Sequence, residues 1–158
     1  MNTMLKMQYQ FRPMLIDDLD MVMMIEPLIY PYPWSRGNFS DSLNSGYSAW
    51  ILMRNEAIIG YALVMMVLDE AHLLNLSIAK NFQKQGLGRL LLEYMIQIAR
   101  KHLAVNMFLE VRSSNVSAIA LYENMGFNEM AIRRNYYPAD PKYFKSGRED
   151  AVLMGLAL

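Results

Sequence analysis

The fold of this chain is decided by the stretch Gln83-Lys84-Gln85-Gly86-Leu87-Gly88-Arg89, which leads directly into an apolar-periodic segment at 90–100. Glycine takes positive φ and carries no Cβ, so Gly86 and Gly88 let the backbone approach a ligand while successive N–H groups point at it. The positive end of the following helix dipole adds to the attraction for an anion. The stretch predicts a phosphate-binding loop at a helix N-terminus, although a loop that only begins a helix has the same pattern.

Two common nucleotide-binding motifs do not fit this loop. A nucleoside-triphosphate P-loop needs Lys-Ser/Thr directly after its last glycine, whereas Gly88 is followed by Arg89-Leu90. The dinucleotide motif G-x-G-x-x-G needs a third glycine, and Leu91 stands at that position. The loop therefore indicates a phosphorylated ligand of another kind.

We expect residues 1–158 to form a single domain, because a chain of 158 residues with 54% hydrophobic and 19% charged residues can bury a sizeable core. The formal net charge is zero, so no global basic field favours nucleic acid as a partner. No stretch has 18 consecutive apolar residues and polar residues interrupt positions 1–12, so we expect no membrane span, no secretion signal and a cytoplasmic location. The oligomeric state stays open between a monomer and a weak dimer.

The absence of cysteine excludes disulfides, thiolate zinc sites and a cysteine nucleophile. With His72 and His102 as the only histidines, we expect no metal site. His102 follows Arg100 and Lys101 at the end of a predicted helix, where a cation complements the helix dipole. We therefore expect a structural role for His102.

Hydrophobic periodicity and turn residues predict the order strand, two helices, three strands, helix, strand, helix and two strands. In chain order, these elements are a strand at 8–14, helices at 17–27 and 35–44, strands at 48–54, 57–67 and 72–79, a helix at 87–100, a strand at 107–111, a helix at 115–125 and strands at 131–134 and 151–158. A long connection at 135–150 joins the last two strands. The mixture predicts an α+β fold with a mixed, mostly antiparallel twisted sheet of about seven strands and about four helices.

Glu110 is the first candidate for chemistry outside the loop. By alternation along the strand at 107–111 it shares a face with Phe108 and Arg112. A carboxylate in a central strand is costly unless it is paired or used. An ion pair with Arg112 is one interpretation, and a role in a reaction is the other.

The predicted helix at 115–125 carries a second group of candidates. Asn115, Ala118 and Tyr122 lie at i, i+3 and i+7, so an amide, a small residue and a phenol share one face. Asn115 is also placed to cap this helix, and Tyr122 fits a core aromatic, so structural roles remain open for both. Gly126-Phe127 ends the helix and begins the next strand.

Taken together, these features resemble the GNAT superfamily of acyl-CoA-dependent N-acetyltransferases, over nearly the whole chain. The matching pattern is Gln83-x-x-Gly86-x-Gly88 after a strand, a strand bearing Glu110, and then Asn115-x-x-Ala118-x-x-Leu121-Tyr122-x-x-x-Gly126-Phe127. Five further segments are similar to the bacterial ribosomal-protein-alanine N-acetyltransferases: Pro33-Trp34-Ser35, Leu68-Asp69-Glu70-Ala71, Leu109-Glu110-Val111-Arg112, Arg133-Arg134-Asn135-Tyr136-Tyr137-Pro138 and Gly147-Arg148-Glu149-Asp150-Ala151.

The resemblance implies a GNAT-like fold and direct acetyl transfer from acetyl-CoA to the N-terminal alanine of the eighteenth protein of the small ribosomal subunit. It implies that Glu110 is the general base and Tyr122 the general acid. It also implies a set of cofactor-binding residues: the backbone of Leu76, Ser77 and Ile78 for the pantetheine arm, Lys84, Gln85, Gly86, Leu87, Gly88 and Arg89 for the pyrophosphate, and Asn115 for a further contact.

These implied roles are consistent with the chemistry. An α-amine, with a pKa of about 8, must lose a proton before it attacks a thioester, and a carboxylate takes that proton directly or through a water. A phenol can protonate the thiolate that leaves. Without a cysteine, transfer within a ternary complex is favoured over an acyl-cysteine intermediate.

Other interpretations remain open from the sequence. The acceptor could be a different amine, in a small molecule, another protein N-terminus or a lysine side chain, or the chain could be a non-catalytic acyl-CoA-binding module. The connection at 139–146 looks longer than the usual link in the family, and we expect it to reshape the peptide site. Asp69, Glu70 and the pair Glu149-Asp150 could attract a basic peptide, although exposed carboxylates are more often solvated surface.

Overall fold

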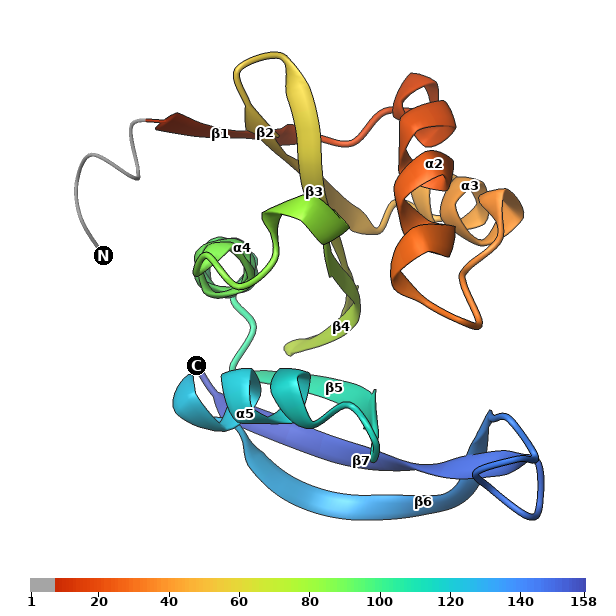
Figure 1. Ribbon diagram of the computed structural model, residues 1–158. Coiled ribbons are helices and arrows are strands. Elements are labelled where there is room, and N and C mark those ends of the chain that lie inside the picture. The colour runs from red at the N-terminus through yellow and green to blue at the C-terminus, as the bar shows by residue number, and fades with distance from the viewer. Residues whose placement is uncertain (1–7) are drawn as a thin grey trace.

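A seven-stranded mixed sheet forms the centre of the protein in the computed structural model, which describes residues 8–158 (Figure 1). The strand order across the sheet is β1-β2-β3-β4-β5-β7-β6. The strands are β1 (Tyr9–Pro13), β2 (Ser48–Arg54), β3 (Ala57–Val67), β4 (Glu70–Ile78), β5 (Asn106–Arg112), β6 (Asn128–Pro138) and β7 (Arg148–Ala157). Only β4 and β5 pair in parallel within this sheet. The expectation for the first seven residues, that they carry no secretion signal, lies outside the described part of the chain.

Helices cover both faces of the sheet. They are α2 (Leu19–Ile29), α3 (Arg36–Asn44), α4 (Leu87–Lys101) and α5 (Val116–Asn124), with short 3-10 turns η1 (Ile16–Asp18) and η2 (Lys80–Phe82). Figure 1 shows α2 and α3 on one side of the β1–β4 half and α4 on the other, while α5 lies against β5 and β7. No helix within residues 8–158 is long and apolar enough to cross a membrane.

Two hydrophobic cores result from the alternation of side chains across the strands. Neighbouring residues on β2 go to opposite sides: Leu52 packs in the core under α4, and Ile51 packs in the core under α2 and α3. Both are fully buried. β2 and β3 are therefore largely apolar on both faces, which is why they read as nearly continuous hydrophobic runs.

The predicted fold class and order of elements are confirmed. Ser35 caps α3, where its hydroxyl accepts a 3.1 Å hydrogen bond from the Asn38 N–H, and Asn115 caps α5. His102 ends α4 with Nδ1 at 2.8 Å from the Ile98 carbonyl oxygen, which confirms its structural role. In these places the capping residues were sufficient to predict the helix boundary.

The last two strands were predicted too short. β6 runs to Pro138 and β7 begins at Arg148, so the expected connection at 135–150 contracts to a loop at 139–147. The ladder between these strands has a register irregularity between Arg133 and Tyr137, and Asn135 has a φ of 49°. A bulge of this kind breaks the strict alternation on which the strand prediction depends.

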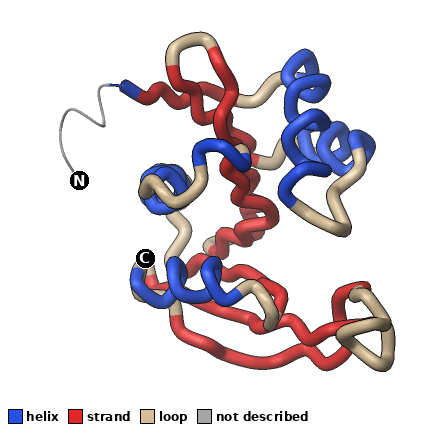
Figure 2. The backbone as a smooth tube through the Cα atoms, in the orientation of Figure 1, coloured by secondary structure: helices blue, strands red, loops and turns tan. Residues whose placement is uncertain are grey.

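β4 and β5 separate at their carboxyl ends. Their paired residues run only from Glu70↔Asn106 to Leu73↔Leu109, whereas β4 continues beside β3 as far as Ile78. A register shift in the β3–β4 ladder, just after Leu73, marks the start of the divergence. Figure 2 shows the two strands parting, with loops and helix ends grouped around the opening. The segment 74–78 thus has no β5 partner among the described pairs, and its backbone edge faces the gap.

Candidate active site

The gap between β4 and β5 contains two adjoining cavities. The larger, of about 980 Å³, extends to the η2–α4 loop, and the smaller, of about 350 Å³, extends toward α2 and β6. Seven residues line both of them: Tyr30, Tyr32, Leu76, Arg112, Asn115, Ala118 and Tyr122. The cavities therefore meet between the free end of β4 and the first turns of α5.

The glycine loop forms one end of the larger cavity. Gly86 is the N-cap of α4 with a φ of 81°, no side chain caps this helix, and the first intrahelical bond is the 3.1 Å contact from Leu90 N–H to Gly86 O. The N–H groups at 87–89 are thus available to an anion at the positive end of a 15-residue helix. Lys84 and Arg89 add positive charge to the same wall. This end of the cavity fits a diphosphate.

Eight of the ten residues predicted to bind the cofactor line the larger cavity: Leu76, Ile78, Lys84, Gly86, Leu87, Gly88, Arg89 and Asn115. The side chain of Ser77 points elsewhere, since it is buried and donates a 2.6 Å hydrogen bond to Asn75 Oδ1. Gln85 is also absent from the lining, and its Nε2 lies 3.5 Å from Asn81 O. Gln83 instead holds the loop in place, because its Nε2 donates a 2.9 Å hydrogen bond to Ile78 O.

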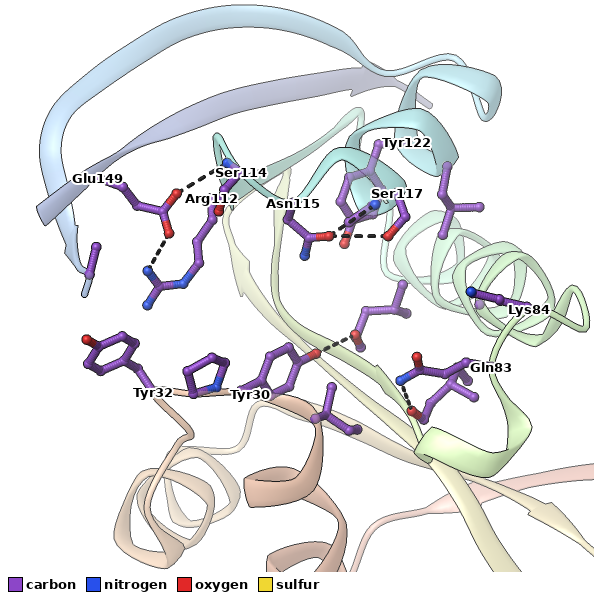
Figure 3. A pocket seen from close by; sticks show the side chains of 18 of the residues that line it. Tyr30, Tyr32, Gln83, Lys84, Arg112, Ser114, Asn115, Ser117, Tyr122 and Glu149 are labelled. Atoms are coloured by element: carbon purple, nitrogen blue, oxygen red, sulfur yellow. Dashed lines mark hydrogen bonds and ion pairs between the residues drawn. The ribbon is translucent and has the colours of Figure 1, made fainter. Parts of the chain in front are cut away.

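α5 directs an amide and a phenol into the junction of the two cavities (Figure 3). Asn115 Oδ1 accepts the Ala118 N–H at 3.3 Å, so its Nδ2 donors remain for a ligand. Tyr122 is 8% exposed and lines both cavities. Burial raises the pKa of this phenol, with a further contribution from Tyr30. Tyr122 therefore keeps its proton at neutral pH.

Glu110 lines only the smaller cavity. Its side chain is 24% exposed and its Oε1 lies 3.4 Å from Arg133 Nη2. Its hydrogen bonding also raises the pKa of the neighbouring Tyr136 phenol. The predicted alternative of an ion pair between Glu110 and Arg112 is wrong, because Arg112 pairs with Glu149 at 2.8 Å. The carboxylate remains accessible to an acceptor in the smaller cavity.

Arg112 joins three segments at the mouth of the cavities. Its guanidinium lies 5.2 Å from the Tyr32 ring centre and 4.6 Å from that of Tyr137. Burial would raise the pKa of Glu149, but hydrogen bonds from Arg112 and Ser114 outweigh it, so that this pKa is lowered. These contacts tie the α2–α3 connection to β6 and β7.

Three of the four acidic residues considered for binding a basic peptide have partners within the protein, while the binding of such a peptide stays a prediction. Glu149 is 5% exposed and paired with an arginine, and Asp150 pairs with Arg134 at 2.8 Å. Glu70 pairs with His72 at 3.0 Å and begins β4, at the opposite end of the strand from the cavities. The structure places the 139–147 loop at the larger cavity through Ala139, Asp140, Tyr143 and Phe144, while its effect on a peptide stays a prediction.

Glu26, a buried carboxylate in the wall of the smaller cavity, was not among the site residues predicted from the sequence. It is 1% exposed and accepts hydrogen bonds from Trp34 N–H at 3.2 Å, from Asn75 Nδ2 at 3.4 Å and from the Tyr61 hydroxyl. Burial raises the pKa of this carboxyl, while the hydrogen bonds oppose that effect.

The signal for Glu26 was present in the sequence. Leu19, Val22 and Glu26 stand at i, i+3 and i+7 of α2, and all three lie on its buried face. A carboxylate in a register otherwise occupied by core residues is expensive without a purpose. The pattern therefore indicates that Glu26 is a candidate functional residue.

Comparisons with known proteins agree with this geometry. Residues 19–127 match the family model described as "Acetyltransferase (GNAT) family". The [ribosomal protein bS18]-alanine N-acetyltransferase of Escherichia coli (strain K12) is 43% identical over 141 residues, which cover 89% of this chain and 92% of that protein.

Solved structures show the same fold. The ribosomal-protein-S18-alanine N-acetyltransferase from Escherichia coli has a TM-score of 0.86 at 40% identity, covering 94% of this chain and 93% of that one. Arabidopsis thaliana NAA60 in complex with acetyl-CoA has a TM-score of 0.81 at 19% identity, covering 95% of this chain and 99% of that one. The family model covers most of this chain, and the Escherichia coli relative is 43% identical over most of both chains. The protein therefore belongs to the acetyltransferase (GNAT) family.

Proposed function

We propose that this protein transfers the acetyl group of acetyl-CoA to the α-amino group of the N-terminal alanine of a small-subunit ribosomal protein. The observation that carries the proposal is the pair of cavities meeting at Tyr122, one ending in an anion-binding loop and the other holding Glu110. The name of the Escherichia coli relative describes the same reaction in that protein. The proposal includes a single domain over residues 1–158, acting in the cytoplasm as a monomer or weak dimer.

Acetyl-CoA fits the larger cavity. The uncapped N-terminus of α4 and the cations Lys84 and Arg89 would hold the pyrophosphate. The free backbone edge at 76–78 would pair with the pantetheine arm in the manner of an added strand. This placement brings the thioester to the junction of the cavities and supplies the acetyl group there.

The residues around the smaller cavity complete the reaction. Glu110 takes a proton from the ammonium of the acceptor, directly or through a water, and the free amine forms the new C–N bond. As the C–S bond breaks and the carbonyl re-forms, Tyr122 donates its hydroxyl proton to the departing sulfur, so CoA leaves as a thiol, and the new amide nitrogen releases its second proton to solvent. Proton exchange with solvent then restores Glu110 and Tyr122. Holding both reactants in adjoining cavities supplies much of the acceleration.

The smaller cavity has room for the first residues of a peptide. Its volume is about 350 Å³, and its walls include the aromatic side chains of Tyr30, Tyr32, Trp34 and Tyr137. The dimensions therefore support a peptide N-terminus as the acceptor. Alanine as its first residue is supported by the name of the Escherichia coli relative.

Acetyl transfer to a synthetic peptide with the N-terminal sequence of the ribosomal protein tests the proposal. The expected result is turnover with the free Ala peptide and none with the same peptide blocked at its α-amine, which separates α-amine from lysine acetylation. A peptide beginning with Trp is the control for selectivity at the first position, and we expect lower turnover. No reaction with the Ala peptide alongside turnover of a polyamine would overturn the substrate assignment, and CoA binding without any transfer would favour a non-catalytic module.

A further inference from the structure

Glu26 occupies an unusual environment for an ionisable group. Its carboxyl is 1% exposed, its three partners are neutral donors, and no cation among the described residues lies within ion-pair distance of it. Replacing buried ionic groups with apolar ones of similar size is often neutral or stabilising. Folding alone therefore does not account for a carboxylate at this position.

The partners of Glu26 connect it to one wall of the smaller cavity. We call residues 30–34 the wall segment, since Tyr30, Tyr32 and Trp34 all line that cavity. Glu26 fixes the far end of the wall segment by accepting the Trp34 N–H at 3.2 Å. The near end is fixed by Tyr30, whose hydroxyl lies 3.1 Å from Leu76 O.

A chain of hydrogen bonds joins these two anchors through β4. Asn75 Nδ2 donates to Glu26 at 3.4 Å, and Asn75 Oδ1 accepts from Ser77 Oγ at 2.6 Å. Ser77 Oγ lies in turn 2.7 Å from the Tyr30 hydroxyl. Both ends of the wall segment are thus connected by hydrogen bonds to the part of β4 that diverges from β5 and borders the cavities.

Aromatic packing also connects the wall segment to Glu26. The Trp34 ring lies 5.1 Å from the Phe39 ring, which lies 5.7 Å from the Tyr61 ring in an edge-to-face arrangement. The Tyr61 hydroxyl donates to Glu26. Glu26 is therefore the point at which the wall segment, α3 and the sheet are held together.

We infer that Glu26 is a positioning residue for the acceptor: by anchoring Trp34 and Asn75 it fixes the wall segment to β4 and sets the shape of the smaller cavity. With 1% exposure it offers almost no surface to an acceptor, so it acts through the groups it holds. The inference rests on the proposed function in that the smaller cavity is the acceptor site.

Two substitutions of Glu26 weaken its hydrogen bonds to different extents. Glu26→Gln keeps a carbonyl oxygen for Trp34 and Asn75 and removes the charge, whereas Glu26→Leu removes every acceptor at similar size. Because one and then all of the anchoring hydrogen bonds are weakened, the KM for the Ala peptide should rise about threefold in the first and about tenfold or more in the second. The affinity for CoA and the acidic limb of the pH–rate profile should stay unchanged in both. Val22→Ala is the matched control, since Val22 lies on the same buried face of α2 outside the network.

A second readout requires no acceptor. The chain has two tryptophans, so a Trp50→Phe background leaves Trp34 as the only one. Acrylamide quenching of Trp34 fluorescence should increase from Glu26 to Gln to Leu, because the wall segment loses its anchor. If quenching increases across the variants in this order but the wild type does not acetylate the Ala peptide, the proposed function fails and the positioning role stands.

Three results would overturn the positioning role. One is an unchanged peptide KM and unchanged Trp34 quenching in both Glu26 variants. Another is an equal rise of KM in Val22→Ala, which would indicate general softening of α2. The third is loss of the acidic limb in Glu26→Gln, which would mean that Glu26 itself exchanges the proton. If Glu26→Leu does not fold, Glu26→Asp decides through the same measurements, because its shorter side chain withdraws the acceptor from Trp34 and Asn75.

Discussion

Replacing Tyr122 with phenylalanine removes one oxygen atom at the junction of the two cavities. The side chain lines both cavities, and the ring stays packed 5.7 Å from Phe127. The free energy of unfolding should therefore change by less than about 0.5 kcal/mol. The shape of the larger cavity is preserved as well, so CoA should bind with nearly wild-type affinity.

The rate of transfer should respond very differently from stability. A positioned general acid contributes about 10²–10⁴-fold, and each factor of ten corresponds to about 1.36 kcal/mol of activation free energy. The expected loss in kcat for Tyr122→Phe is about 100-fold or more, because phenylalanine has no proton to donate to the departing sulfur.

The assay for Tyr122→Phe benefits from the composition of the chain. The protein has no cysteine, so the CoA thiol released with an Ala peptide can be followed with a thiol reagent without background from the enzyme. Tyr9→Phe is the matched control, since Tyr9 is 7% exposed in the same core and lies on β1, away from the cavities. A kcat within about threefold of wild type would refute the general-acid role, and so would an equal loss of rate in the Tyr9 variant.

Three further predictions concern other parts of the site. Glu110→Gln should lower kcat about 100-fold or more and abolish the acidic limb of the pH–rate profile while CoA affinity, measured by calorimetry, stays unchanged; a retained acidic limb would contradict the general-base role. Gly86→Ala should lower the free energy of unfolding by about 1 kcal/mol, because an L-residue is strained at a φ of 81°, and it should also weaken CoA binding. Gly46→Ala is the control, because it carries the same strain at a φ of 78° and should leave CoA binding intact. Equal CoA affinities of the two variants would show that the loop does not bind phosphate. Because the folded-state pKa of Glu149 lies below its ordinary value of 4.5, its contribution is complete above that pH and is lost as the pH falls through the lowered pKa. Glu149→Gln should therefore lower stability at pH 7 by about 1–2 kcal/mol through Arg112 and flatten the acid limb of the stability curve measured by denaturant unfolding, and an unchanged curve would show that the pair does not contribute.

Local signals were sufficient to predict most of the fold. The period of 3.6 residues in α4, the capping residues Ser35 and Asn115 and the glycine that ends α5 each determine structure within a few residues of themselves. Such signals need no knowledge of distant contacts. They gave the order of elements and the loop at Gly86 correctly.

The features that the sequence did not reveal depend on contacts between distant segments. The partner of Arg112 is Glu149, 37 residues away, and the sequence offered Glu110 as a nearer choice. The network of Glu26 joins α2 to Tyr61 and Asn75, at separations of 35 and 49 residues. Periodicity placed Glu26 on a buried face, but only the fold shows which donors meet it there.

The division of residues between the two cavities predicts how the enzyme handles its two substrates. The loop at 84–89 borders only the larger cavity and Glu110 borders only the smaller, while Tyr122 borders both. In the proposed reaction the acetyl carrier and the acceptor occupy separate spaces that meet at this junction, where Tyr122 is placed to protonate the sulfur. A covalent acyl-enzyme through a thiol is excluded because the chain has no cysteine. Transfer consequently requires both substrates to be bound together, and initial-rate plots against either substrate should intersect rather than run parallel.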